Sequence, residues 1–422
     1  MSMTMFYKLI FMSLWNRRAS ITLILVSITL SISLLISVEH LRREARESFT
    51  KTISGTDLIV GARSGQVNLL LYSVFRIGDA TNNISWESYK EIASDKKTKW
   101  SVPISLGDSH KGFRVMGTTE LYFDKYRYGN KIPLSFSKGE KFKHVYDAVL
   151  GFQVAKELNY EVGQKIILSH GMGKVSFSKH DDKPFEIVGI LEPTGTPVDR
   201  TVHISLAGIE AIHIDWQQGV KTPGIKISAD ETLNQDLTPK AITAAFVGLK
   251  SKVATFGLQR KINEYRQEPL MAIIPGLALV QLWQIVAVVE NLLIIISALV
   301  VLTGLMGMVT TLLAGLNERR REMAILRSLG AKPSYIFLLL MTESIILAVT
   351  GSLIGIALVF LMLALLKPVL ISQYGIFISI NPVNTYVLTI IGFIIGIAAI
   401  LGLFPSLIAY KRSLKDGLNI KI

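Results

Sequence analysis

The stretch Asn317–Ser334, NERRREMAILRSLGAKPS, stands between two of the most apolar runs of the chain. It carries five basic residues against two acidic ones, and its apolar residues lie on one side of a short helix. A membrane-topology anchor requires only the positive charges. A short helix with an apolar side, ended by Gly330 and kept from continuing by Pro333, can also dock in a groove of a partner. The residues leave both interpretations open.

Four apolar runs are long enough to cross a bilayer, which requires about 20 mainly apolar residues. We expect the spans at residues 19–38, 291–316, 335–366 and 384–409. The first run is too long for a typical signal-peptide core and no small-residue cleavage pattern follows it, so we expect an uncleaved anchor. Only 18% of the 422 residues are charged, below the roughly 25% of an ordinary soluble domain, and there is no cysteine for a disulfide or a thiolate metal site.

The net charge of +13 is concentrated at the span ends, which disfavours nucleic acid as a partner. Basic residues gather in segments 1–18, 317–334 and 410–422, whereas the loop 367–383 has only Lys367. Because basic segments remain in the cytoplasm, we expect both termini inside and the region between the first two spans outside. Within residues 1–18, apolar residues at helical spacing among basic ones predict an amphipathic helix at the cytoplasmic face of the membrane.

The segment 39–275 has the mixed composition of a folded domain. Strand-like runs lie at residues 57–62, 112–117, 165–169, 185–191 and 201–206. Helical patterns lie at Trp86–Ala93, Gly151–Leu158 and Ala241–Lys250, the last within a longer helix expected over Pro239–Gln267. These elements predict an α+β domain. Residues 39–53 and 276–290 extend the first two spans as more polar helices, either as a two-helix stalk or as unrelated juxtamembrane helices.

The sequence gives no positive indication of catalysis. The Gly-rich pieces at residues 61–65 and 170–174 lack phosphate-loop spacing and are expected to be turns. Seven histidines are scattered without zinc-site spacing, and the SKHDDK segment around His180 is expected to be a solvated loop. No Gly-x-Ser-x-Gly nucleophile motif is present. We therefore expect a non-catalytic chain with no metal site and no cofactor of its own.

Small residues in the spans mark faces for close helix packing. They are Gly351 and Gly355 in the third span, Gly392 and Gly396 in the fourth, and Thr22, Thr29, Ser33 and Ser37 in the first. The contact can lie within one chain or between two chains. Two acidic residues, Glu290 and Glu343, lie near span ends, where the cost of burying a charge is reduced. Glu343 is expected to pair with Arg17, Arg18 or Arg327, with a proton relay as the alternative.

Several segments, in this order, resemble one family. ERRREMAILRSLGAKPSYI is similar to the motif E-R-x-x-E-I-x-x-x-(+)-x-x-G-A, and the first span follows an amphipathic start with a basic pair. DAVLGFQVAKELNYEVGQKI and PFEIVGILEPTGTPVDRTVHISL resemble hallmark segments of the family's outer domain. LGLFPSLIAYKRSLKDGL resembles the C-terminal motif, except that Ser413 and Leu414 replace its proline region and Gly417 its alanine. The chain thus resembles the permease subunits of MacB/FtsX-type (type VII, mechanotransmission) ABC transporters.

The resemblance implies an α-helical membrane protein with four transmembrane helices and a large α+β extracytoplasmic domain between helices 1 and 2, in a bacterial inner membrane. It implies two copies of a separate ABC ATPase, which bind ATP and Mg²⁺, and a second permease in a homodimer or heterodimer. A periplasmic adaptor or a lipoprotein can join them. The outer domain is larger than that of typical FtsX proteins, which favours the MacB or LolC/LolE type, acting on a peptide, drug, lipoprotein or cell-wall hydrolase.

By the same resemblance, segment 317–334 is the coupling helix that meets the ATPase. The residues implied are Glu318, Arg319, Arg320, Arg321, Glu322, Met323, Ile325, Leu326, Arg327, Leu329 and Gly330. The competing hypothesis is a membrane-anchored regulator or scaffold that signals to an extracytoplasmic enzyme or lipoprotein without transport. A secondary transporter is disfavoured, because the four spans show no inverted repeat.

Overall fold

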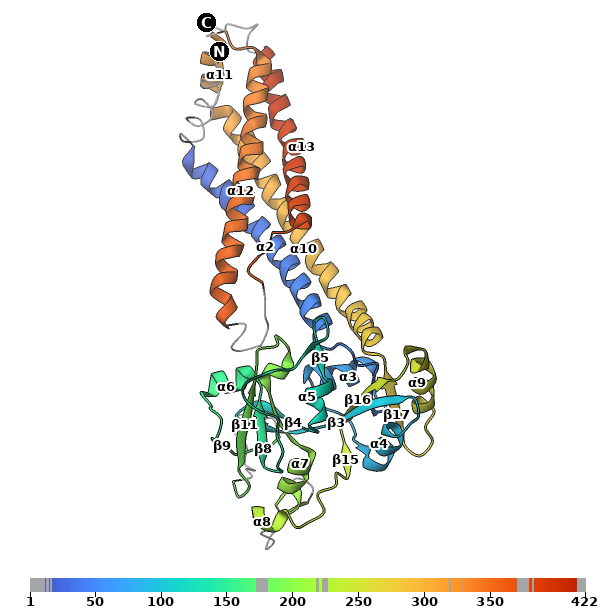
Figure 1. The fold of residues 1–422 in the computed structure, drawn as a ribbon. Helices are drawn as coiled ribbons and strands as arrows, with labels where there is room; N and C mark the ends of the chain where they lie inside the picture. Colours follow the sequence, from blue (N-terminus) through green and yellow to red (C-terminus); the bar gives the residue numbers. More distant parts are fainter. Residues whose placement is uncertain are drawn as a thin grey trace. The chain divides into compact units, whose positions relative to one another are not determined.

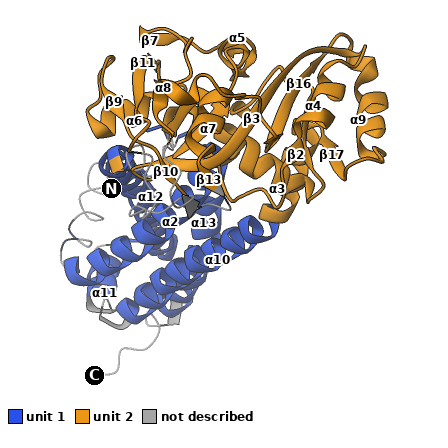
Figure 2. Cartoon of the chain, turned by 90° about the horizontal axis from the view of Figure 1, so that it is seen from below, with its two compact units in different colours: residues 1–44, 287–368, 378–422 blue, residues 45–286, 369–377 orange. Residues whose placement is uncertain are grey.

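The computed structural model describes residues 12, 15, 17–171, 181–217, 220–221, 227–318, 320–328, 330–369, 379–381 and 383–415, and side chains at all of these except 217, 220–221, 317–318, 320–321 and 414–415. The chain divides into two compact units (Figure 2). We call residues 1–44, 287–368 and 378–422 the membrane unit, and residues 45–286 and 369–377 the outer unit. Most of the amphipathic helix expected over residues 1–18 lies outside the described residues, as does most of the loop 367–383.

Four helices of the described chain are long and apolar enough to cross a membrane. They are α2 (Arg18–Lys51), α10 (Pro275–Glu318), α12 (Pro333–Val369) and α13 (Thr385–Lys415), all visible as long ribbons in Figure 1. Each of these helices contains one of the expected apolar runs in full, except that residue 384, the first of the fourth run, precedes α13. Pro275 and Pro333 occupy the first positions of their helices, where a missing N–H removes no intrahelical bond.

The core of the membrane unit is built around α2. Its isoleucines at positions 21, 24, 28, 32 and 36 recur every three or four residues, lie on one face and are all buried. They pack with buried apolar residues of α10, α12 and α13. Small residues allow close approach: the Ser31 hydroxyl donates to the Val300 carbonyl of α10 at 3.1 Å, and Gly402 of α13 lies against Ser344 of α12.

The expected packing glycines fall into two groups. Gly351 and Gly355 face α2: a Cβ added at Gly351 would lie 2.6 Å from Ile28 Cγ2, and one at Gly355 would lie 3.3 Å from Ile32 Cγ2. The Thr29 and Ser33 hydroxyls donate to the carbonyls of these two glycines at 3.4 and 3.2 Å. By contrast, a Cβ added at Gly392 or Gly396 would have no side chain or neighbouring helix of the described chain within 4 Å. The hydroxyl of Ser37, which was also expected to pack, is buried and has no hydrogen-bond partner among the described residues.

The outer unit contains a mixed sheet of eleven strands within the described residues (Figure 1). The strand order is β17 (Leu270–Ile273), β1 (Leu58–Ala62), β16 (Ala244–Leu249), β3 (Thr98–His110), β4 (Phe113–Thr118), β12 (Thr201–Ser205), β8 (Asp147–Leu150), β11 (Phe185–Leu191) and β7 (Phe136–Gly139). In addition, β10 (Ser169–His170) pairs with β3, and β9 (Lys165–Ile166) pairs with β11. Pairs β4–β12 and β8–β11 are parallel and all other pairs are antiparallel.

Short elements cover the sheet and connect its strands. The helices are α3 (Gln66–Leu70), a π-helical turn (Leu71–Phe75), α4 (Trp86–Ala93), α5 (Leu121–Lys125), α6 (Phe152–Leu158), α7 (Leu206–His213), α8 (Ala229–Thr232) and α9 (Thr255–Asn263), with 3₁₀ turns at Pro197–Arg200 and Lys252–Ala254. Three two-stranded pairs are β2 (Ile84–Ser85) with β15 (Ala241–Ile242), β5 (Arg127–Tyr128) with β6 (Ile132–Pro133), and β13 (Trp216–Gln217) with β14 (Val220–Lys221). The α+β prediction for this region is confirmed.

Two local predictions are wrong. The segment Ala241–Lys250 forms β15 and β16 instead of a helix, and within Pro239–Gln267 the only α-helix is α9. Every residue of β16 is buried, and the strand pairs with β1 on one side and β3 on the other, so tertiary pairing overrides the helix preference of its alanines. The run 165–169 is divided between β9 and β10, which pair with different strands.

Candidate functional site

The candidate coupling segment forms a separate short helix. Helix α11 (Arg320–Ser328) follows α10 and precedes α12. Gly330 has a φ of 90°, the left-handed conformation that favours glycine. Its N–H donates to the Arg327 carbonyl at 2.9 Å, and the Ala331 N–H donates to the Leu326 carbonyl at 3.0 Å. These two bonds are the Schellman arrangement, which ends a helix sharply, so the chain turns into α12 within a few residues.

The described side chains of α11 separate into two faces. Met323 is half-buried and packs against a cluster of Leu316, Ile336, Leu340 and Ala409, from α10, α12 and α13. Ile325 is 60% exposed and Glu322 is also exposed, whereas Leu326 and Arg327 are half-buried. One face of α11 is therefore anchored to the membrane unit and another presents both apolar and charged groups.

Part of the coupling set lies beyond what the structure describes. Arg319 and Leu329 are outside the described residues, and for Glu318, Arg320 and Arg321 only the backbone is described. Glu343, the acidic residue of the third apolar run, is buried in α12 with 1% of its surface exposed.

Beyond the apolar runs, α2 and α10 contact each other through polar and aromatic side chains. In the membrane unit, the Arg42 guanidinium lies 3.8 Å from the Glu290 carboxylate and donates two hydrogen bonds of 3.0 Å to Glu39. In the outer unit, the Arg46 guanidinium lies 5.3 Å from the ring centre of Trp283, and the Phe49 ring lies 5.6 Å from it. Each unit therefore contains its own contact between the two helices.

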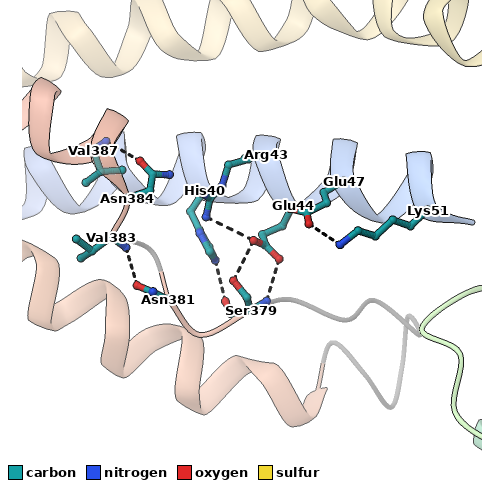
Figure 3. A network of polar contacts seen from close by, with 10 residues as sticks. All are labelled: His40, Arg43, Glu44, Glu47, Lys51, Ser379, Asn381, Val383, Asn384 and Val387. Atoms are coloured by element: carbon teal, nitrogen blue, oxygen red, sulfur yellow. Dashed lines mark hydrogen bonds and ion pairs between the residues drawn. The ribbon is translucent and has the colours of Figure 1, made fainter. Parts of the chain in front are cut away.

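The segment before α13 is attached to α2 by hydrogen bonds (Figure 3). The His40 imidazole contacts the Ser379 carbonyl oxygen at 2.9 Å, and the Glu44 carboxylate accepts from the N–H and hydroxyl of Ser379 at 2.9 Å each. The Asn384 side chain then accepts from the Val387 N–H at 2.8 Å and caps α13. These contacts fix the start of α13 against α2 within the membrane unit.

The outer unit contains a cavity of about 410 Å³ beside the last turns of α2. Ser48, Phe49 and Thr52 contribute from α2, and much of the remaining wall is apolar. Three arginines also line it: Arg76, Arg114 and Arg200. The guanidinium groups of Arg114 and Arg200 are paired with Asp79 and Glu157, so the apolar part of the wall is the part suited to a ligand.

Two buried ionisable sites support the core of the outer unit. The Lys183 ammonium donates to the Asp215 carboxylate at 2.7 Å, and both side chains are fully buried. The His203 ring is also fully buried and lies against Tyr122 and Phe123. Burial, assisted by the positive charge of Arg76, lowers the pKa of His203 to about 3, so this imidazole is neutral at physiological pH.

The structure brings together one group of residues that could hold a metal ion, which sequence reasoning missed. Asp108, His170 and His213 place their ligand atoms within 4.8 Å of one another. They come from β3, β10 and α7, so no spacing along the sequence could identify them. Only the pairing of β10 with β3, which sets His170 opposite Asp108, creates the cluster.

Comparisons with known proteins cover both units. Residues 20–245 match the family model of the MacB-like periplasmic core domain, and residues 294–414 match that of the FtsX-like permease C-terminal region. The chain is 23% identical over 365 residues to the macrolide export ATP-binding/permease protein MacB of Bdellovibrio bacteriovorus. This match covers 79% of the chain and 50% of the relative, so the chain spans about half the length of that protein.

Two solved structures align with about half of the chain. The periplasmic region of MacB from Actinobacillus actinomycetemcomitans aligns with a TM-score of 0.34 and 11% identity, over 55% of this chain and 94% of that structure. The extracellular domain of the noncanonic ABC-type transporter YknZ from Gram-positive bacteria aligns with a TM-score of 0.30 and 12% identity, over 52% of this chain and 99% of that structure.

Proposed function

Because the chain belongs to the MacB-like, FtsX-like ABC transporter permease family, we propose that it converts ATP hydrolysis in a separate ATPase subunit into movement of its outer unit. The observation that carries this proposal is α11, a short helix with a sharp stop between two long apolar helices. Its exposed Ile325 and Glu322 offer an apolar and a charged contact to a groove on the partner.

Continuous helices provide the path for the movement. Helix α10 has 44 residues and α2 has 34, which correspond to about 66 and 51 Å, whereas the hydrocarbon core of a bilayer is about 30 Å thick. A displacement of α11 acts on the end of α10 through the short connection between them. The contacts of Arg42 with Glu290 and of Arg46 with Trp283 couple α10 to α2. Movement of α2 then changes the wall of the 410 Å³ cavity, to which Phe49 contributes.

The complete assembly contains two ATPase subunits and a second permease. In this proposal ATP and Mg²⁺ bind to the ATPase, where hydrolysis takes place. Gly392 and Gly396, which have no neighbour within the described chain, are suited to close contact with the second permease. Both termini lie in the cytoplasm of a bacterium in this proposal, with the outer unit beyond the inner membrane, and the basic segments at the span ends support that orientation. The work done is export or extraction of a periplasmic or membrane-derived substrate, with an adaptor or a lipoprotein as a further partner.

The test is a double charge reversal on α11. We expect Glu322→Lys with Arg327→Glu to abolish stimulation of the co-purified ATPase while leaving membrane insertion unchanged. The matched control is Arg260→Glu with Glu264→Arg, which reverses an exposed ion pair of 2.8 Å on α9 of the outer unit. The control should retain full stimulation.

The alternative function is a membrane-anchored regulator or scaffold without a transport cycle. It requires no ATPase, so a stable chain that never retains an ATPase subunit during purification would favour it. If the α11 double variant keeps full ATP turnover, α11 is only a topology anchor.

A further inference from the structure

The cluster of Asp108, His170 and His213 lies in the outer unit. The cross-strand pair of β10 and β3 sets His170 opposite Asp108, with His170 Nδ1 at 3.1 Å from Asp108 Oδ1. His213, the last residue of α7, brings its Nε2 to 3.3 Å from His170 Nδ1 and 3.5 Å from Asp108 Oδ1. Two nitrogens and one carboxylate oxygen therefore form a nearly equilateral triangle.

The size of this triangle matches the coordination of one small cation. A tetrahedral Zn²⁺ with bonds of about 2.05 Å separates its ligand atoms by about 3.3 Å, which is the mean of the three observed edges. An ion can thus reach all three atoms without moving any of them by more than a few tenths of an ångström. Two imidazoles and one carboxylate are ligands typical of Zn²⁺ and related transition metals, whereas Ca²⁺ and Mg²⁺ take oxygen ligands.

A neighbouring backbone contact sets the tautomer of His213. His213 Nδ1 lies 2.8 Å from the Ile209 carbonyl and donates to it, so the neutral ring carries its lone pair on Nε2, the atom that faces Asp108 and His170. A backbone carbonyl on the second nitrogen is the usual support of a metal-bound histidine. The Ser109 hydroxyl donates to the Gly171 carbonyl and holds β10 beside β3.

Burial and charge also favour a cation at this position. Asp108 is only 2% exposed, and a nearby cation stabilises a buried carboxylate. A proton on His213 is the competing way to supply it: burial lowers the pKa of this histidine, but the hydrogen bond and the charge of Asp108 outweigh that effect and raise it. Access is open, because the side chains of His170 and His213 are 40% and 26% exposed.

We propose that Asp108, His170 and His213 bind a divalent transition-metal cation of the Zn²⁺ class, with three protein ligands and a remaining position open to solvent. The site ties β3, β10 and the end of α7 together in the outer unit. Metal binding at this site does not depend on the coupling function of α11, because α11 lies in the membrane unit. Either proposal can therefore be refuted without affecting the other.

The experiment titrates Zn²⁺ into the chelator-treated full chain in detergent by calorimetry, and Co²⁺ by its visible absorption, which distinguishes tetrahedral from octahedral coordination. We expect one ion per chain, a rise of the melting temperature with Zn²⁺, and no effect of Mg²⁺ or Ca²⁺. Asp108→Asn and His170→Ala should each weaken Zn²⁺ binding by more than about 100-fold, because loss of a group that only orients a ligand already costs about 10- to 100-fold. The control His144→Ala removes an exposed histidine outside the cluster and should bind normally.

Two outcomes overturn the proposal. One is the absence of stoichiometric Zn²⁺ binding by the wild-type chain. The other is equal Zn²⁺ affinity in wild type, His170→Ala and His144→Ala. That result would mean that the two histidines only form hydrogen bonds with each other and with the buried Asp108. His170 is partly exposed, so its alanine variant tests the site even if Asp108→Asn fails to fold.

Discussion

A graded series of glycine substitutions tests how the membrane unit is packed. A Cβ at Gly351 would lie 2.6 Å from Ile28 Cγ2, about 1 Å closer than the optimum of roughly 3.5–4.0 Å between carbon atoms. Overpacking of this kind costs about 1–3 kcal/mol. Separation of α2 and α12 would also lengthen the hydrogen bonds from Thr29 and Ser33, each worth about 0.6 kcal/mol in a membrane protein. Alanine also gains up to about 1 kcal/mol of helix propensity over glycine, so Gly351→Ala should destabilise the chain by about 1–3 kcal/mol.

The other glycines give the series its internal controls. At Gly355 the nearest contact of an added Cβ is 3.3 Å, so alanine should cost less than about 1 kcal/mol. At Gly392 and Gly396 an added Cβ meets no atom of the described chain within 4 Å, so in the single chain, separated from the proposed second permease, alanine should be neutral or stabilising by up to about 1 kcal/mol through its helix propensity. The assay is unfolding of the full chain in mixed detergent micelles, followed by tryptophan fluorescence. A Gly351→Ala chain as stable as wild type, or a reversed order of the series, would refute the packing argument.

Three further outcomes are expected in the same unfolding assay. Between pH 6.5 and pH 4.5 the free energy of unfolding should fall by about 2 kcal/mol, because the unfolded chain protonates His203 below about pH 6.5 while the folded chain keeps it neutral down to about pH 3; a His203→Gln chain that shows the same slope would exclude this cause. Lys183→Met should lower the free energy of unfolding by about 3–5 kcal/mol, because Asp215 stays buried without its lysine, and adding Asp215→Leu should restore most of this stability. A double variant as unstable as Lys183→Met alone would contradict the buried-charge explanation. A double-mutant cycle of Arg42→Ala and Glu290→Ala should give a coupling below about 1 kcal/mol, since the pair is 3.8 Å apart and Arg42 is 27% exposed; a coupling above about 2 kcal/mol would show that these helices are held together more strongly.

Elements with a strong local signal could be predicted from the sequence. The apolar runs lie in α2, α10, α12 and α13, and the predicted bounds Trp86–Ala93 are those of α4, where Ser85 accepts from the Ser88 N–H as an N-cap. The end of α11 could also be predicted, because glycine, found at position 330, is the residue type that the left-handed conformation after a helix favours.

Features that depend on distant partners could not be predicted. The alanines of β16 favour a helix by themselves, and only its pairing with β1 and β3 makes the segment a strand. Asp108, His170 and His213 are separated by 62 and 43 positions along the chain, and the approach of His170 to Asp108 is a consequence of sheet register. For the same reason Gly351 and Gly392 look alike in sequence, although only Gly351 meets another helix of the described chain.

The pairing of β1 with β17 has a mechanical consequence for the outer unit. The chain enters β1 from α2 and leaves β17 into α10, and Ile59 is opposite Ile273 at the end of the ladder where both helices attach. If the two helices were pulled apart, they would unzip this ladder one hydrogen bond at a time, which is the direction in which paired strands resist force least. The contacts of Trp283 with Arg46 and Phe49 join α10 to α2 close to where the two helices connect to that ladder. A force that separates the two helices must break these contacts before it acts on the first hydrogen bonds of the ladder.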